Sequence, residues 1–365
     1  MTKSMATVGR AAGATARSSA PVPAAPTFKA GRPRSVSIII SSYNYGRYVA
    51  QAIQSARQQD FSGFDDWELV VVDDGSTDDS AQVIEQICRR PRRGERLVFL
   101  RQRNAGQTAA INTGFAASRG EMVVFLDADD FLLPGAVQAH AEGLAQAGVV
   151  RSQGYMRVVD ARGQTTGART PQRPAPDGDT APQLAARGPG AVVSTANSGN
   201  AWRREFLRDI FPLPTAGALN PDALLMDSAP FHGWTVTLDH PVAAYRRHPA
   251  NISSAIAAFS LANIDKVLDA RARRAAWMAQ AAGEPAGGAR WLDEDWRIAT
   301  LRHLSGRLGG ASSGPSLRRH LSAAMKIDGR PSKKLALAAA VCAVRAAPRP
   351  AAVALARRMI HLEFM

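Results

Sequence analysis

The densest chemical feature of the sequence is an acidic turn in which Asp127, Asp129 and Asp130 follow the apolar run MVVFL. Three carboxylates this close repel one another, and a divalent cation among them would relieve that repulsion. Mg²⁺ and Mn²⁺ take oxygen ligands from one or two carboxylates together with phosphates and waters. The spacing therefore predicts a Mg²⁺ or Mn²⁺ site. The alternative is a polar strand-to-helix turn in which Asp130 caps the helix.

A second acidic turn starts at Asp73 and Asp74, directly after the apolar run WELVVV. A carboxylate at such a strand end can accept a hydrogen bond from a nucleobase or a ribose. Gly75 permits a tight turn, and Ser76 is one of the residues that could cap the following helix. A ligand-binding turn and a simple capping turn are therefore both open for this segment.

Two further polar segments contain candidate binding residues. Tyr43 offers a ring on which a nucleobase could lie, and Ser42 offers a hydroxyl beside it. Small residues in the second segment let a backbone approach a ligand, or let a helix pack closely on a sheet. The candidates in these two segments are Ser42, Tyr43, Asn44, Asn104, Gly106 and Asn112.

These residues need a scaffold that brings strand ends together, and the apolar patterning predicts one. Mostly β-branched apolar runs are typical of parallel strands buried on both faces, and they alternate here with helical spacing. Ligands of such sheets bind beyond the carboxyl ends of the strands, where the polar residues lie. The predicted strands are Val36–Ser41, Trp67–Val72, Leu97–Arg101 and Met122–Leu126, and the predicted helices are Tyr48–Gln58, Asp78–Arg89, Gln107–Arg119 and Pro134–Ala147.

The second half of the chain has a less regular pattern. Ala161–Gly190 is rich in Gly, Pro, Thr and Arg without periodicity, which predicts a long loop or insertion. Asn220–His232 is predicted to be helical, and Thr235–Arg247 has the pattern of a strand. From about Ile256 the Ala/Arg-rich sequence predicts helices, with breaks at Gly and Pro clusters.

The polar segments in this order resemble the family 2 glycosyltransferases of the GT-A fold. The resemblance lies in VSIIISSYN, VVVDDGSTDDS and RNAGQTAAINTGFAASRGEMVVFLDADD, and continues through SGNAWRREFLRDIFPLP, NPDALLMDSAP and YRRHPANIS. It implies an α/β fold, with a Rossmann-like, mixed, mostly parallel sheet flanked by helices and a helical C-terminal appendage. It also implies an inverting enzyme that moves a sugar from a nucleotide-diphosphate donor to an acceptor hydroxyl, in bacterial cell-surface polysaccharide or glycoconjugate synthesis.

The resemblance also implies roles for individual residues. Asp73 would contact the nucleobase, with Ser42 and Tyr43 beside it. Asp127 and Asp129 would serve ribose, diphosphate and metal, with His248 as a third metal contact. The other residues expected to line the substrate sites are Asn44, Asp74, Asn104, Gly106, Asn112 and Trp202.

The catalytic base implied by the resemblance is Asp222, at a place where the family carries an acidic pair. Here the pair is Pro221 and Asp222, so one acid is missing. Without the family, Asp222 is an ordinary acid at a helix N-terminus. Asp227 is the rival base, and the incomplete pair leaves open a non-catalytic nucleotide-sugar-binding protein of the same fold.

We expect three parts in the chain: a disordered, basic, Ala/Pro-rich tail over 1–34, a GT-A domain over 35–255 and a basic helical region over 256–365. Within the domain, 35–135 would bind the donor and 136–255 the acceptor. Cys88 and Cys342 lie in unlike contexts, which fits a reducing cytoplasm rather than a disulfide framework. No apolar stretch reaches the ~20 residues of a spanning helix.

The net charge is +14, and the basic residues gather at the two ends of the chain. Such asymmetry suggests a polyanionic partner, either nucleic acid or an anionic membrane, or else solvated tails. The basic residues have no interleaved aromatic platforms and the middle of the chain is slightly acidic, so we expect no nucleic-acid partner. From Lys333 onward, apolar stretches alternate with Arg345, Arg349, Arg357 and Arg358. This pattern predicts either helices lying on the inner face of the cytoplasmic membrane, near a glycan or lipid-linked acceptor, or a helical subdomain packed on the catalytic domain.

Overall fold

A computed structural model describes residues 28–90, 94–172, 177–216, 220–249, 251, 261–284, 287–310, 314–326 and 331–361. Residues 1–27, which make up most of the predicted N-terminal tail, lie outside the described residues, as do residues 362–365 at the end of the C-terminal region.

The first half of the molecule is a parallel sheet with the strand order β3-β2-β1-β4. Its strands are β1 (Ser35–Ser42), β2 (Asp66–Asp73), β3 (Arg96–Arg101) and β4 (Met122–Asp127). Helices connect or follow these strands, namely α1 (Gly46–Arg57), α2 (Ser80–Cys88), α3 (Gln107–Ala117) and α4 (Ala136–Leu144). All four predicted strands and all four predicted helices are confirmed, with ends that shift by a few residues.

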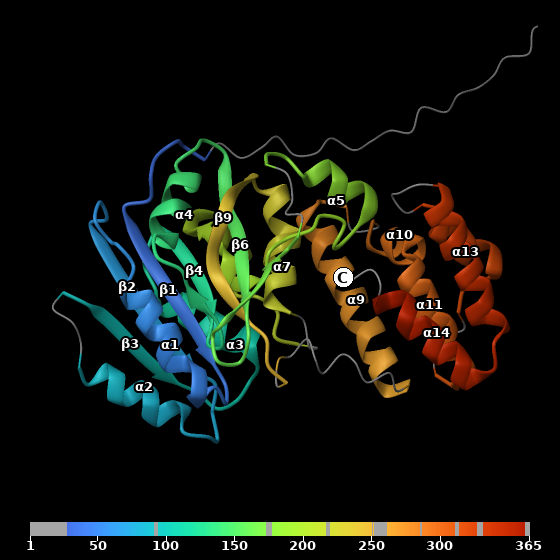
Figure 1. Ribbon diagram of the computed structural model, residues 1–365. Helices are drawn as coiled ribbons and strands as arrows, with labels where there is room; N and C mark the ends of the chain where they lie inside the picture. The colour runs from blue at the N-terminus through green and yellow to red at the C-terminus, as the bar shows by residue number, and fades with distance from the viewer. Residues whose placement is uncertain are drawn as a thin grey trace, which may run out of the picture.

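Helices cover both faces of this sheet, which explains the long apolar runs in its central strands (Figure 1). Along β1, Ile38 and Ile40 pack on one side with residues of α1, α2 and α4. The residue between them, Ile39, packs on the other side with residues of α3 and of two later helices, α6 (Arg204–Ile210) and α7 (Pro221–Ser228). Successive strand side chains point to opposite faces, so a strand buried on both faces is mostly apolar, and its buried polar residues need partners, as Ser37 and Glu68 find in each other.

The second half extends the sheet beyond β4 in the order β8-β6-β9-β5. Strand β7 pairs with β6 outside this order. These strands are β5 (Phe131–Leu132), β6 (Val149–Val159), β7 (Thr165–Thr170), β8 (Asn200–Arg203) and β9 (Trp234–Arg246). The β4–β8, β8–β6 and β5–β9 pairs are antiparallel, so the complete sheet is mixed. The predicted helix at α7 and the predicted strand at β9 are confirmed, whereas β5, β6 and α6 were not predicted.

The prediction that Ala161–Gly190 forms a loop is wrong in its described part, because this segment contains β7 and the helix α5 (Ala181–Arg187). The side chain of Arg169 on β7 lies over the ring of Tyr155 on β6, with 4.3 Å between the guanidinium carbon and the ring centroid. Leu184 on α5 packs with Phe231 and Trp291, which come from distant parts of the chain. Both elements are stabilised by long-range contacts that a local pattern does not reveal.

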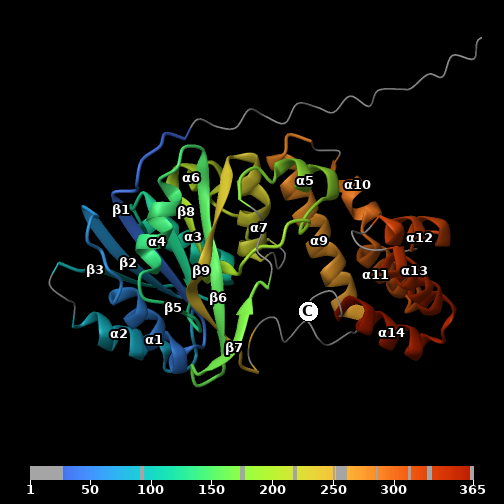
Figure 2. The same cartoon turned by 45° about the horizontal axis from the view of Figure 1, so that its top comes forward.

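The C-terminal region is helical, as predicted. Its helices are α9 (Leu261–Ala281), α10 (Gly287–Glu294), α11 (Trp296–Arg307), α12 (Leu317–Met325), α13 (Pro331–Ala346) and α14 (Arg349–His361). Helix α9 packs on α7, where Trp277 donates from Nε1 to Ser228 Oγ at 2.8 Å. Helices α10 to α14 lie on the far side of α9 from the sheet (Figure 2). Of the helices that the structure describes, none combines the length and the apolar character needed to cross a bilayer.

Gly114 on α3 allows that helix to lie close on β1, and its replacement gives a test of the packing. A Cβ at this position would lie 2.4 Å from Cγ2 of Ile39. We expect Gly114→Ala to lower the free energy of unfolding by about 1–3 kcal/mol, measured by denaturant titration, because the helix must move off the sheet. The control is the exposed Ala116 of the same helix, where Ala116→Ser should change that free energy by less than about 0.5 kcal/mol. Equal effects of the two substitutions would contradict the packing argument.

Candidate functional site

Several polar residues predicted from the sequence meet at one edge of the sheet, because neighbouring parallel strands end at the same level. Ser42 pairs with Asp73 across β1 and β2, and Ser41 pairs with Asp127 across β1 and β4. The carboxyl ends of the three strands therefore end side by side. The sheet brings together the Ser42 hydroxyl and two carboxylates that are far apart in the sequence.

Among the described residues, two buried polar atoms at the ends of β1 and β2 have no hydrogen-bond partner. They are Ser42 Oγ and Asp73 Oδ1. The other carboxylate oxygen of Asp73 is satisfied, since Arg101 Nε lies 3.2 Å away and the Ser76 N–H donates to it at 3.3 Å. Buried polar atoms are rarely left unpaired, so an unpaired donor and acceptor side by side indicate a place for a polar ligand. Tyr43 beside them keeps 43% of its surface exposed, as a ring that stacks on a ligand would.

Asn44 and Asp74, which are expected to line the substrate, also organise the loops of the site. Asn44 has a positive φ of 58°, and its Oδ1 accepts from the N–H of Thr77 at 2.8 Å. The carboxylate of Asp74 accepts from the N–H groups of Ala105 and Gly106 at 3.0 and 2.8 Å. Their polar atoms thus hold the loop after β3 and the loop after β2 in place.

The three residues predicted to bind substrate before and within α3 differ in their exposure and hydrogen bonds. Asn104 and Gly106 are exposed in the loop before the helix, where a ligand can reach them. Asn112 is partly buried, and its amide exchanges two hydrogen bonds of 2.8 Å with the backbone of Leu213. It therefore ties α3 to the segment after α6, and its contact with substrate stays a prediction.

Asp127 lies at the end of β4 with its carboxylate among amides and other acids. Its Oδ1 accepts from Gln107 Nε2 at 2.9 Å and from Asn197 Nδ2 at 3.0 Å. Burial, followed by the negative charges of Asp222, Asp130 and Asp129, raises the pKa of Asp127 well above its usual value. This edge of the sheet therefore gathers several carboxylates, which is an environment that favours a cation.

Asp129 is the second acid of the turn, and it meets His248 from the loop after β9. Its Oδ2 lies 3.1 Å from His248 Nε2 and accepts from Asn251 Nδ2 at 3.2 Å. The His248 ring packs on two tyrosines, with ring centroids 5.9 Å from Tyr45 and 4.8 Å from Tyr48. The predicted proximity of Asp129 and His248 is therefore present in the structure, across 119 positions of sequence.

Asp130 has a structural role, but it does not cap a helix as the alternative interpretation required, because the short strand β5 follows it. Its side chain is 1% exposed. Ser198 Oγ donates to it at 2.7 Å, and the backbone N–H of Arg246 donates at 2.9 Å. Asp130 thus joins the acidic turn to β9 and to the 3₁₀ turn η1 (Asn197–Gly199).

The residues at this edge suit a magnesium or manganese ion that shares its ligands with a substrate. Among the residues that the structure describes, no three His, Cys, Asp or Glu side chains gather closely enough to hold a metal by themselves. Mg²⁺ does not need such a cage, since it binds through one or two carboxylates, waters and substrate phosphates. Asp127 and Asp129, with His248 against Asp129, provide a donor set of this kind.

Asp222 lies in the first turn of α7, behind the N-cap Asn220 and Pro221. Its Oδ2 accepts from the backbone N–H of Asn197 at 3.1 Å, and the side chain of the same Asn197 donates to Asp127. Burial raises the pKa of Asp222 to about 6. Asn197 therefore places the predicted base beside the acidic turn.

Asp227, the rival base, points away from this edge into a tight ion pair. Its side chain is 2% exposed, and both of its oxygens accept from Arg274 on α9, one of them at 2.9 Å. A carboxylate held by a bidentate guanidinium is a poor proton acceptor. The geometry favours Asp222 over Asp227.

Trp202 lies in the core rather than at an accessible surface, which corrects the expectation that it contacts substrate. Its side chain is fully buried on β8 and packs on Phe206, with ring centroids 5.8 Å apart. The guanidinium of Arg151 lies over its ring at 5.2 Å. Trp202 therefore supports neighbouring residues from the core.

Sequence reasoning missed three side chains at the site: Asn197, Asn251 and Tyr45. Asn197 belongs to the small polar run before β8, and this run was a signal, because such residues suit turns that bind ligands. Asn251 lies three residues after His248, inside a segment already singled out. Burial and the charge of Asp129 raise the pKa of Tyr45, whose ring packs on His248, but nothing in its local sequence sets it apart.

Comparison with known proteins shows which family and fold this chain resembles. Residues 37–211 match the family model described as glycosyl transferase family 2. An uncharacterized glycosyltransferase of Nostoc sp. is 38% identical over 217 residues, which is 59% of this chain and 66% of that protein, just under two thirds of its length.

Two solved structures share the fold. The structure of residues 1–349 of S. aureus TarS in complex with UDP-GlcNAc has a TM-score of 0.57 at 19% identity, covering 88% of this chain and 89% of that one. A mannosyltransferase of Pyrobaculum calidifontis in complex with GDP-Man and Mn²⁺ has a TM-score of 0.50 at 16% identity, covering 90% of this chain and 88% of that one. At these identities the likeness concerns the fold alone.

Proposed function

Because this chain belongs to glycosyl transferase family 2 and has the GT-A fold, we propose that it transfers a sugar from a nucleotide-diphosphate donor to an acceptor hydroxyl with inversion at the anomeric carbon. The observation that carries the proposal is the edge where Ser42 and Asp73 present unpaired polar atoms beside the carboxylates of Asp127 and Asp129. We assign the donor to the 35–135 half and the acceptor to the 136–255 half.

Different strand ends contribute different parts of the proposed donor site. Asp73 Oδ1 accepts a hydrogen bond from the nucleobase and Ser42 Oγ contributes a second polar contact, while Tyr43 covers the ring. Asp127, Asp129 and His248 hold Mg²⁺ or Mn²⁺, as in an Asp-X-Asp metal motif. When bound, the ion offsets the negative charge that develops on the departing nucleoside diphosphate. The exposed Asn104 and Gly106 flank this site.

Asp222 acts as the general base. Its Oδ2 is fixed by the Asn197 N–H, and no hydrogen bond to its Oδ1 is found within the described residues. Oδ1 is therefore the atom that accepts the proton from the attacking acceptor hydroxyl. One base and one direct displacement invert the configuration of the transferred sugar.

The raised pKa of Asp222 predicts the pH dependence of the reaction. The base works only when ionised, and a pKa of about 6 leaves it half protonated at that pH. We expect kcat/KM, which reports the free enzyme, to fall about tenfold per pH unit below pH 6 and to level off above about pH 7. The residual rate of the Asp222→Asn variant should not fall in this way below about pH 6, because the variant has no carboxylate at this position to protonate. A flat wild-type profile between about pH 5 and pH 7 would exclude Asp222 as a base with this pKa.

The function is tested by screening nucleotide-diphosphate sugars for a Mn²⁺-dependent rise in Tm, and then following donor consumption with the sugar that binds. Transfer to an acceptor, or hydrolysis of the donor, is the expected result. The rival function is a non-catalytic nucleotide-sugar-binding protein. It predicts a shift in Tm with no consumption of the donor at any pH.

We further propose that the enzyme works in the cytoplasm on the inner face of the membrane, where it would use a glycan or lipid-linked acceptor in polysaccharide or glycoconjugate synthesis. The support is the start of α13, where Leu335 keeps 64% of its surface exposed next to Lys333 and Lys334. An apolar side chain flanked by cations suits an anionic leaflet. At the same time, Val341 and Val344 of α13 are buried against other helices, so this helix also belongs to a packed subdomain.

Flotation with vesicles of phosphatidylglycerol tests the membrane proposal. The double variant Lys334→Glu/Leu335→Glu should lower the bound fraction several-fold, whereas Arg162→Glu, at an exposed position near β7, should not. We chose point variants because Val341 and Val344 are buried, so deletion of α13 would disturb the helical subdomain. Equal flotation of both variants and the wild type would remove the membrane proposal and leave the transferase proposal untouched.

A further inference from the structure

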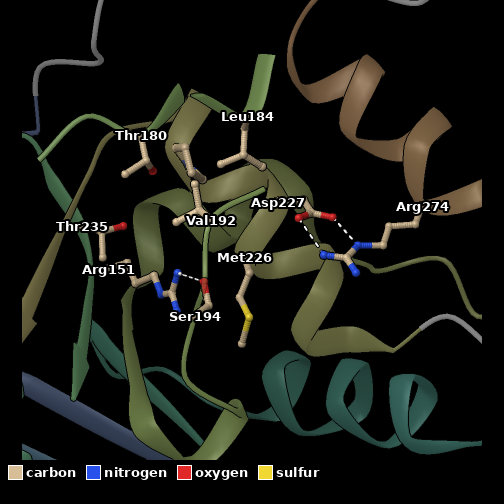
Figure 3. Close-up of a pocket in the computed structure, with 10 residues that line it drawn as sticks. Arg151, Thr180, Leu184, Val192, Ser194, Met226, Asp227, Thr235 and Arg274 are labelled. Carbon is tan, nitrogen blue, oxygen red and sulfur yellow. Dashed lines mark hydrogen bonds and ion pairs between the residues drawn. The ribbon is translucent and has the colours of Figure 1, made fainter. Parts of the chain in front are cut away.

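A cavity of about 160 Å³ lies behind the proposed base, between the sheet, α5, α7 and α9 (Figure 3). This is well above the ~10–15 Å³ that a single water needs, so the cavity can hold a group of several atoms. Arg151 of β6 and Arg274 of α9 lie on different sides of it, and Met226 of α7 lines it between them. The donor site and the metal ligands proposed above lie outside this cavity.

Arg151 is the unusual group in the cavity wall, because it is a buried cation that forms no ion pair with any residue that the structure describes. Its side chain is 2% exposed, and it donates only to neutral groups, at 2.8 Å to Asn200 Oδ1, 3.2 Å to Ser194 Oγ and 2.8 Å to Gln153 Oε1. A guanidinium has five N–H donors, so two remain beyond these three bonds. Burial lowers the pKa of Arg151 to about 9, which still leaves it charged at neutral pH. Burying an unpaired charge is costly, and an anion beside it would offset that cost.

The other charges at the cavity cancel. Arg274 and Asp227 form the ion pair described above, which leaves Arg151 as the cation among the cavity-lining residues that no carboxylate bonds directly. The hydroxyls of Thr180 and Thr235 add hydrogen-bonding groups to the wall. The cavity is therefore polar and positive on the Arg151 side.

The cavity is connected to the base through a single short segment of chain. Ser194 accepts from Arg151, and three residues later the Asn197 N–H holds Asp222. Asp222 and Asp227 also lie on the same helix, α7, and the negative charge of Asp222 acts on Arg151. A group bound at Arg151 would therefore sit next to the acceptor hydroxyl that Asp222 deprotonates.

We propose that this cavity is an acceptor subsite for an anionic group, a phosphate or a carboxylate, with Arg151 as its specificity-determining residue. The inference rests on the proposed transferase function and names the acceptor class: a sugar or alcohol that carries a negative charge near the hydroxyl to be glycosylated. The two unused N–H groups of Arg151 and the hydroxyls of Thr180 and Thr235 hold the anion. Val192 and Leu184 contact the carbon atoms that bear it.

Calorimetric titration of the full chain with inorganic phosphate tests the site itself. The titration is done in EDTA, so that no metal ion draws phosphate to the donor edge. We expect Arg151→Gln to weaken phosphate binding at least tenfold, and Arg162→Gln, which removes the same charge from an exposed position, to leave it within twofold. Unchanged binding in Arg151→Gln, or no phosphate binding by the wild type, would overturn the proposal.

A second variant keeps the test decisive if Arg151→Gln does not fold. Val192→Phe fills the cavity from its apolar wall and leaves every charged group in place. It should also weaken phosphate binding at least tenfold, while the Tm without phosphate stays within a few degrees of the wild type. If a folded Val192→Phe protein bound phosphate with wild-type affinity, the anion would bind elsewhere and the proposal would be wrong.

Glucose 6-phosphate and glucose then separate an acceptor group from a free anion. If the cavity holds the anionic group of an acceptor, the phosphorylated sugar binds at least tenfold more tightly than glucose, and Arg151→Gln removes this preference. If phosphate binds through Arg151 but the two sugars bind equally, the cavity is a free-anion site and the acceptor assignment is wrong. Anion binding without nucleotide-sugar turnover would instead count against the transferase function alone.

Discussion

Replacing Asp129 by Ala should abolish sugar transfer while the protein stays folded. Asp129 is the carboxylate that meets His248, and its loss removes one of the few oxygen ligands available to a metal ion at the end of β4. We expect kcat/KM to fall by a factor on the order of 10³ or more, because the developing charge on the leaving diphosphate is no longer offset. We also expect weaker Mn²⁺-dependent binding of the donor, measured by calorimetric titration.

Stability should change little in this variant. The hydrogen bonds that His248 and Asn251 make to Asp129 are lost, but so is one of the clustered negative charges around Asp127 and Asp130. The matched control is Asp239→Ala, which removes an equal charge from a fully exposed side chain and should leave activity unchanged. Full Mg²⁺- or Mn²⁺-dependent turnover by Asp129→Ala would refute the metal-site assignment.

Asp222→Asn should separate donor binding from catalysis. The amide keeps the shape of the carboxylate and can still accept the hydrogen bond from the Asn197 N–H through its oxygen. It cannot take a proton from the acceptor, so we expect kcat to fall by about 10²–10⁴-fold. Donor affinity, measured by titration with Mn²⁺ present, should stay within about threefold of the wild type, because the base acts mainly in the transition state.

The matched variant is Asp227→Asn, five positions along the same helix. Asp227 pairs with Arg274, whose side chain keeps 29% of its surface exposed, so replacing Asp227 leaves a half-buried guanidinium without its partner. Leaving a buried polar group unsatisfied typically costs about 1–3 kcal/mol of unfolding free energy. We therefore expect Asp227→Asn to lower the Tm while the folded fraction retains turnover. A stable Asp227→Asn protein without turnover, next to an active Asp222→Asn protein, would move the role of base to Asp227.

The sequence by itself was sufficient to predict the strands of the donor half of the sheet. β1, β2 and β4 are buried along most of their length, and these three strands and the partly buried edge strand β3 all contain apolar runs that stand out locally. A parallel sheet also aligns its carboxyl ends, and the polar residues that follow β1, β2 and β4 had to meet at one edge. For this reason the amino-acid pattern alone is enough to place Ser42, Asp73 and Asp127 together.

Only the tertiary structure decided which polar residues face a ligand and which hold the protein together. Asn112 bonds to a backbone 101 positions away, and Asp130 bonds to Ser198 across 68 positions. Such pairings leave no periodic trace, since a side chain's partner depends on how distant segments pack rather than on its neighbours in sequence. The same holds for the buried Trp202, the ion pair of Asp227 and the cavity beside Arg151, which exist only because β6, α7 and α9 come together in space.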